Sequence, residues 1–183
     1  MKVAEAYSII CMIFASNFAD AITDEALKKL KPNWLLKTQN PENTKGNELL
    51  IKALSSCNSS DIAADLDSFK GACSLKFFKQ ISDEDIDNFY KQINFNKPFT
   101  NLRPTHISNM LSLLGVIFKN DTNDKTHALL GLYLTNYLLP SLMLFAKFLR
   151  YSAKTPYYQA MAEFIMDFIK TIKANLGLKI DIQ

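Results

Sequence analysis

The residue types that most often carry chemistry are few in this chain and widely spaced. Its two histidines, His106 and His127, show no metal-ligand spacing such as HExxH and have no cysteine nearby. Cys11, Cys57 and Cys73 form no CxxC, and an odd count without a framework spacing indicates a reducing compartment or buried thiols. The sequence also contains no GxSxG and no glycine-rich phosphate loop. We therefore expect a protein without catalytic activity, without a metal site and without a cofactor.

Carboxylates are the one polar type that clusters along the chain. Asp65 and Asp67 form one pair, and the run at 83–87 holds four acids. Such pairs can serve general acid–base chemistry, but acids also stabilise the first turn of a helix through its dipole. The 82–85 stretch, Ser-Asp-Glu-Asp, has capping-box spacing. We therefore interpret both groups as the solvated start or face of a helix.

Composition places the chain among globular proteins. Its 183 residues are 48% hydrophobic and 21% charged, with a net charge of only +3. Lysines and acids are interleaved, so no basic stripe indicates a nucleic-acid partner. A chain of this length can bury a core without disulfides. We expect one domain spanning residues 1–183.

Apolar residues follow helical spacing from end to end, and no alternating strand pattern appears. The sequence therefore predicts an all-α fold of eight or nine helices. Ser60 and Thr155 are expected to cap helices, Gly177 to end the last one, and Trp34 to anchor the loop at 33–43. The polar stretch at 94–103 is the best candidate for an internal hinge. Expected helices cover about 3–20, 24–31, 125–138 and 140–152, and others carry residues 49–57, 62–73, 86–93, 107–118 and 158–172.

Two apolar stretches have alternative interpretations. Residues 8–21 follow a basic residue, as in a cleaved leader, but their apolar positions mark one helix face. Residues 126–146 carry no charge and are long enough to span a bilayer. Pro140 would break the hydrogen-bond ladder in mid-membrane, so we prefer two buried helices that meet near Pro140. No stable membrane insertion is expected.

Four segments of the chain resemble segments of one known family and occur along the chain in the same order as in that family. They are Arg103-Pro104-Thr105-His106 before an apolar helix, the Phe-Tyr segment at 88–95, the Leu-Leu-Pro segment at 137–145, and the Ala-x-Thr-x-Tyr-Tyr segment at 153–162. Residues 60–175 thereby resemble the TorD-like redox-enzyme maturation chaperones. These all-helical cytoplasmic proteins bind the twin-arginine leader of a molybdoenzyme or related redox subunit. They hold the precursor back from export until its cofactor is in place.

The chain departs from the family pattern at several positions. The proline and histidine of the hinge motif are present, but the family's acids beside them are not. Ser141 stands where the family usually has tryptophan, and the groove segment at 65–71 keeps only Phe69 and Gly71. If the family's leader site is retained, the arginines of the leader need other acidic partners, and Asp65 and Asp67 are the candidates.

The resemblance implies a cytoplasmic binding protein whose partner is a twin-arginine leader or the precursor that carries it. The residues expected to form the peptide site are Asp65, Phe69, Phe77, Phe78, Arg103, Pro104, Thr105 and His106. Taken without the family, His106 bonding a loop carbonyl and phenylalanines in the core are the simpler interpretations. A helical adaptor for another protein surface, and a small helical enzyme or membrane-associated protein, are the other hypotheses. Both a monomer and a helix-swapped dimer are compatible with a hinge at 94–103.

Overall fold

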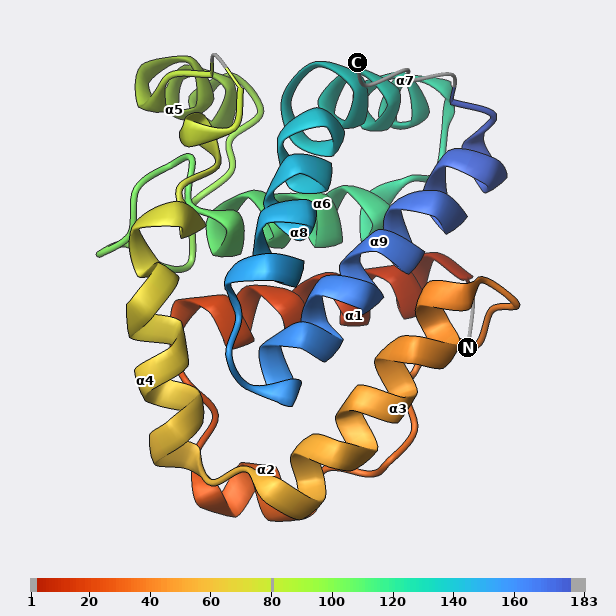
Figure 1. Ribbon diagram of the computed structural model, residues 1–183. Coiled ribbons are helices and arrows are strands. Elements are labelled where there is room, and N and C mark those ends of the chain that lie inside the picture. Colours follow the sequence, from red (N-terminus) through yellow and green to blue (C-terminus); the bar gives the residue numbers. More distant parts are fainter. Residues whose placement is uncertain (1–2, 80, 179–183) are drawn as a thin grey trace. The chain divides into compact units, whose positions relative to one another are not determined.

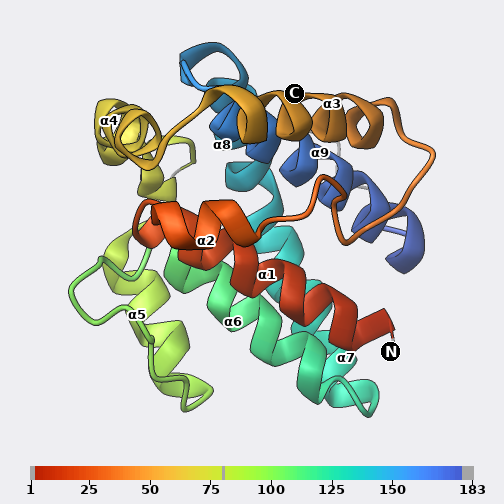
Figure 2. The same cartoon turned by 90° about the horizontal axis from the view of Figure 1, so that it is seen from below.

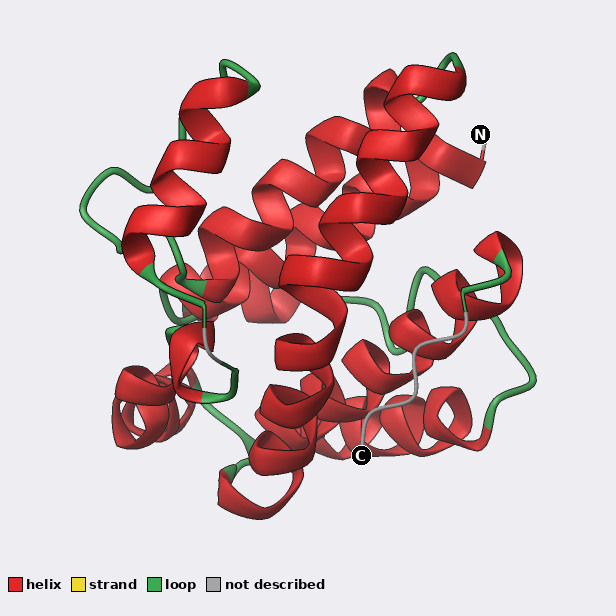
Figure 3. Cartoon of the chain, turned by 90° about the horizontal axis from the view of Figure 1, so that it is seen from above, coloured by secondary structure: helices red, strands yellow, loops and turns green. Residues whose placement is uncertain are grey.

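The computed structural model describes residues 3–79 and 81–178, and these residues fold into helices joined by loops (Figure 1). Colouring by secondary structure shows helix and loop and no strand in this part of the chain (Figure 3). The sole strand-like feature among them is an isolated antiparallel bridge between Ser74 and His106. The predicted all-α fold is therefore confirmed.

The helices divide into two compact units. Of the described residues, unit 1 contains 3–19 and 72–142, and unit 2 contains 20–71 and 143–178. The chain passes from one unit to the other after Ala19, Gly71 and Leu142. The hinge expected at 94–103 thus lies inside unit 1 instead of between the units. The single domain expected for 1–183 stays a prediction.

Unit 1 is built around the pairing of α1 (Val3–Ala19) with α6 (Ile107–Asn120), which lie side by side in Figure 2. Glycine at 115 permits this close approach, because a Cβ there would lie 3.3 Å from the Cys11 Cβ and from the Ser8 carbonyl oxygen. The Tyr7 and Phe118 rings meet edge to face at 5.3 Å nearby. The unit also contains η2 (Leu75–Phe77), α5 (Asp83–Gln92), α7 (Asp124–Tyr133) and η3 (Leu134–Leu138).

Unit 2 is built around α3 (Pro41–Ser56) and α9 (Pro156–Leu176), which pack along each other (Figure 1). The Phe164 ring of α9 lies flat against Gly46 of α3 and stacks on Trp34 at 4.3 Å between centroids. Trp34 is buried by this stacking, which confirms its expected role as an anchor for its loop. The unit also contains α2 (Asp24–Lys29), α4 (Ser59–Phe69) and most of α8 (Leu139–Ser152); η1 (Lys70–Cys73) begins at its edge.

A buried carboxylate joins the start of α3 to α9. Asp167 is fully buried and accepts hydrogen bonds from Thr38 Oγ1 at 2.5 Å, Asn40 Nδ2 at 2.7 Å and Asn43 Nδ2 at 2.7 Å. A buried charge is tolerated when its oxygens are satisfied in this way. Asp167 therefore has a structural explanation and needs no catalytic one.

The two helices expected to meet near Pro140 are one continuous helix, Asp124–Ser152. It widens into a π turn at η3, where the Leu139 N–H donates to the Leu134 carbonyl five residues earlier. Proline lacks an N–H and crowds the carbonyl one turn back, and a widened turn is where a helix takes up such an interruption. Among the described helices this one is long and apolar enough to cross a membrane, but half of its most apolar window is buried. Such burial is found in the core helices of soluble proteins.

Most expected helix ends are confirmed. Ser82 forms a capping box with Asp85, Thr155 caps α9, and Gly177 ends α9 in the left-handed conformation at φ 61°. The cap expected at Ser60 is wrong. Asn58 caps α4 instead, and its side chain accepts the Asp61 N–H at 2.8 Å. Asparagine is as good a cap as serine, and from 58 its oxygen reaches the N–H three residues on.

Candidate functional site

The segment that carries the family-like motif is a loop of unit 1, held in place before α6 begins. The side chain of Asn109, fully buried, accepts the Phe99 N–H at 3.2 Å and donates to the Phe99 and Arg103 carbonyls at 3.1 and 3.0 Å. Lys97 Nζ donates to the Thr100 and Leu102 carbonyls, each at 2.7 Å. The 94–103 loop is therefore fastened at several points along its length.

Two further elements hold Pro104, Thr105 and His106 themselves. The Tyr90 hydroxyl of α5 donates to the Pro104 carbonyl at 2.9 Å. The Leu75 N–H donates to the Thr105 carbonyl at 2.9 Å, and the Thr105 hydroxyl lies 2.8 Å from that of Ser74. The motif is thus clamped between α5 and the segment that begins η2.

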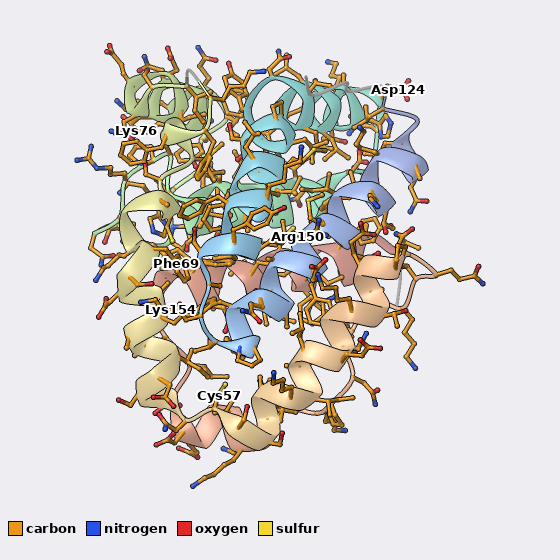
Figure 4. All side chains as sticks on the ribbon, viewed as in Figure 1. Cys57, Phe69, Lys76, Asp124, Arg150 and Lys154 are labelled. Carbon is orange, nitrogen blue, oxygen red and sulfur yellow. The ribbon has the colours of Figure 1, made fainter. Side chains whose placement is uncertain are left out.

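An acid that was not among the predicted site residues lies beside the motif. Asp83, the first residue of α5, accepts the Thr105 hydroxyl at 2.7 Å and the Thr105 N–H at 3.4 Å on one oxygen. Its other oxygen accepts Lys76 Nζ at 2.9 Å and Arg103 Nη1 at 3.0 Å. Lys76 is labelled near α5 in Figure 4. The carboxylate therefore joins three parts of the chain: η2, α5 and the loop that leads into α6.

The surroundings of Asp83 favour its charged form. Partial burial opposes ionisation, but the hydrogen bonds from Thr105, Lys76 and Arg103 outweigh it and hold the pKa of this carboxyl well below its usual range. The N-terminus of α5 also favours a negative charge at this position. Asp83 is thus a fixed anion with a side chain only 27% exposed. Its sole sequence signal was its place among the first-turn acids at 83–85.

His106 has a capping role. It is buried, and its Nδ1 accepts the Ser108 N–H at 3.2 Å at the start of α6. Burial lowers the pKa of His106 to about 4, so the imidazole is neutral at pH 7. A neutral histidine cannot attract a cation by charge. The negative charge beside the motif comes from Asp83 of α5.

The two phenylalanines predicted from the 77–78 stretch differ in exposure. The Phe77 side chain is 67% exposed, and Lys76 Nζ lies 5.8 Å from the centre of its ring. Phe78 is half-buried. An exposed aromatic ring next to Lys76, and so next to Asp83, offers a contact surface at the outer edge of this cluster.

An apolar pocket lies at the other end of α5. It encloses about 530 Å³ counted with its open mouth. Most of its walls are aliphatic or aromatic, and it lies between the turn after α5, the second half of α6 and the start of α7. Its lining residues are Ile93, Asn94, Phe95, Leu113, Val116, Ile117, Asn120, Thr126 and Leu129. None of these was among the residues predicted for the peptide site.

Asp65 and Phe69 belong to unit 2, whereas the other predicted site residues belong to unit 1. Asp65 is buried, and its carboxylate accepts the Thr155 N–H at 2.7 Å, the Thr155 hydroxyl at 2.6 Å and the Lys154 N–H at 3.0 Å. Phe69 is buried against the Tyr158 ring. Figure 4 shows Phe69 near the end of α4 and Lys154 at the turn before α9. Both residues have a structural role, and Asp67 nearby is exposed and pairs with Lys70.

Within residues 3–79 and 81–178 no group of three or more histidine, cysteine, aspartate or glutamate side chains is arranged to hold a metal ion. No family model matches the chain, and neither a curated protein nor a solved structure is significantly similar to it.

Proposed function

We propose that the chain is a cytoplasmic peptide-binding chaperone that takes the twin-arginine leader of a redox-enzyme precursor, as the TorD-like family does. The supporting observation is that a carboxylate, Asp83, lies against the motif in space although the motif itself contains no acid. It contacts Thr105 directly and Arg103 through an ion pair. Arginine is the cation that makes the strongest use of a carboxylate, because its planar head donates several hydrogen bonds.

The apolar pocket lies at a distance from Asp83 that suits such a leader. α5 begins at Asp83 and its 10 residues end at Gln92, directly before the pocket residues 93–95. Ten helical residues cover about 15 Å, which an extended peptide spans in about four or five residues. A twin-arginine leader carries two fixed cations followed by an apolar segment. Its arginines at Asp83 would leave its apolar segment within reach of the pocket.

A helical adaptor for another protein surface is the second candidate. The observation that favours it is the ion pairing of Asp83 with Lys76 and Arg103, which satisfies the carboxylate without a ligand. An adaptor would bind its partner without preferring arginine over lysine. Selectivity for the arginine pair therefore separates the two functions.

The test is calorimetric titration with a synthetic leader that has two adjacent arginines followed by a leucine- and alanine-rich segment, and with its Lys-Lys counterpart. We expect the Arg-Arg peptide to bind at micromolar affinity or better, about −8 kcal/mol. Asp83→Asn should weaken it about ten-fold, because a hydrogen bond to a charged group contributes roughly 1.5 kcal/mol or more. Asp87→Asn, one turn further along the same helix with a side chain 39% exposed and paired with Lys91, is the matched control. Equal affinity for the two peptides would favour the adaptor, and no binding would refute leader recognition.

A further inference from the structure

The Asp83 carboxylate has no acceptor position left for an incoming arginine. An ionised carboxylate offers about four lone-pair sites. Thr105 occupies two of them through its hydroxyl and N–H, and Lys76 and Arg103 occupy the others. A client arginine that binds Asp83 must therefore displace one of these donors.

The donors differ in how firmly they are held. Thr105 is fully buried, and its hydroxyl also contacts Ser74. The Lys76 side chain is 27% exposed, whereas the Arg103 side chain is 65% exposed and reaches Asp83 through Nη1 alone, at 3.0 Å. A single-point pair at the surface is weak compared with a two-pronged arginine–carboxylate contact. Arg103 is therefore the donor that is easiest to displace.

We infer that Arg103 is an internal competitor that occupies the position on Asp83 which an arginine of the client takes. This inference rests on the proposed function and concerns the regulation of the same site. Its guanidinium has the same chemistry as the ligand, and it is attached to the loop that borders the site. In the absence of a client, Arg103 of the same chain thus occupies the site. The apparent affinity for the client is lowered in proportion to the fraction of molecules in which Arg103 holds the carboxylate.

Self-occupation sets the affinity of the site, whereas its selectivity comes from the ligand's geometry. A client lysine would replace the guanidinium contact of Arg103 with the contact of a point charge. A client with two adjacent arginines would replace it with a better-aligned guanidinium contact. Arg103 thereby lowers the apparent affinity of every cation by the same factor, and the preference for arginine comes from the geometry of the guanidinium contact itself. The residue expected from the sequence to contact the leader acts against it in this arrangement.

Arg103→Gln tests the inference, with Lys91→Gln as its matched control. Lys91 lies on α5 of the same unit, and its exposed pair with Asp87 is 2.7 Å long, so both variants lose one positive charge from a surface ion pair. The Arg-Arg peptide should bind Arg103→Gln about two- to five-fold more tightly than Lys91→Gln, which corresponds to roughly 0.4–1 kcal/mol. Adding Asp83→Asn to Arg103→Gln should remove this gain. Unfolding midpoints of the variants establish that each is folded.

The outcomes separate the inference from the function on which it rests. Weaker binding by Arg103→Gln would mean that Arg103 helps to hold the client, and affinity equal to that of Lys91→Gln would mean that no competition exists. Either result overturns the internal competitor while leader binding by the unaltered chain stands. Failure of the peptide to bind the unaltered chain and both variants overturns the leader-binding function and the competitor together.

Discussion

Asp65 is a candidate for a role in leader binding and for a role in folding. The substitution Asp65→Asn distinguishes these two roles. The sequence offers Asp65 as an acidic partner for client arginines. In the structure its carboxylate is buried and accepts three donors at the start of α9: the N–H groups of Lys154 and Thr155 and the Thr155 hydroxyl. It therefore anchors the turn before α9 to α4. We expect the substitution to lower stability and leave arginine selectivity unchanged.

The size of the effect follows from the three donor contacts at 2.6 to 3.0 Å. Asparagine keeps the volume and one acceptor oxygen. It replaces the oxygen that the Lys154 N–H contacts at 3.0 Å with a donor, and leaves that N–H only its second contact, at 3.1 Å. Bonds to a charged acceptor contribute about 1.5–3 kcal/mol each and bonds to a neutral one about 0.5–1.5 kcal/mol. With one contact also turned into a donor–donor clash, the free energy of unfolding should fall by about 3 kcal/mol.

Urea unfolding followed by far-ultraviolet circular dichroism measures this difference. Asp67→Asn is the matched control, because Asp67 lies two residues along the same helix with its side chain 71% exposed and should change stability by less than about 0.5 kcal/mol. An Asp65→Asn protein as stable as the Asp67→Asn control would refute the anchoring role. Loss of leader binding without loss of stability would assign Asp65 to the peptide site.

Two further predictions concern packing and pH. Gly46→Ala should lower the free energy of unfolding by about 1–3 kcal/mol, because the added Cβ would lie 2.5 Å from the Phe164 ring. Trp34 stacks on that ring and prevents it from moving away. An unchanged thermal unfolding midpoint would contradict this prediction. His106→Asn should make stability less dependent on pH between about 6.5 and 4. The folded-state pKa of about 4 lies below the usual value, so the unfolded chain binds the proton first and stability falls as pH drops through this window, by up to roughly 3 kcal/mol. Asparagine can still cap α6 but does not titrate. Urea unfolding at pH 7 and pH 4.5 should therefore show a smaller change in the free energy of unfolding for the variant than for the unaltered chain. Equal changes would refute the role of His106 in this pH dependence.

The helices were predictable because their signals are local. Apolar spacing marks the buried faces, and the caps at Ser82 and Thr155 and the terminator at Gly177 act on neighbouring residues in the chain. Ser60 and Asn58 show the limit of such signals, because both residue types cap well and the choice depends on which oxygen reaches a free N–H. The division into two units has no local signal. It follows from which distant helices pack together, and one of the crossings between the units falls one turn into α8.

The site was predictable only in part, for the same reason. The stretch at 103–106 could be read from the sequence because its residues are consecutive, but the carboxylate that contacts it, Asp83, lies on another helix. Neither the capping-box pattern at 82–85 nor the motif at 103–106 indicates that Asp83 and Thr105 are in contact. Asp65 was misleading for the opposite reason, because its place beside a family-like segment gave no sign that Thr155 would bury and satisfy it. Acidity in the sequence is therefore poor evidence for a free acid in the structure.

Placing the acid outside the motif changes what the proposed site depends on. When an acid and a histidine are neighbours in the chain, their separation is fixed by the backbone. Here the distance between Asp83 and Thr105 is fixed by tertiary contacts, namely Tyr90 on the Pro104 carbonyl and Asn109 on the loop that leads into the motif. These two side chains point at the backbone, so they determine how well an arginine is held without being its ligands. Conditions that loosen the 94–103 loop should therefore release a client of the proposed site, because they separate the motif from Asp83.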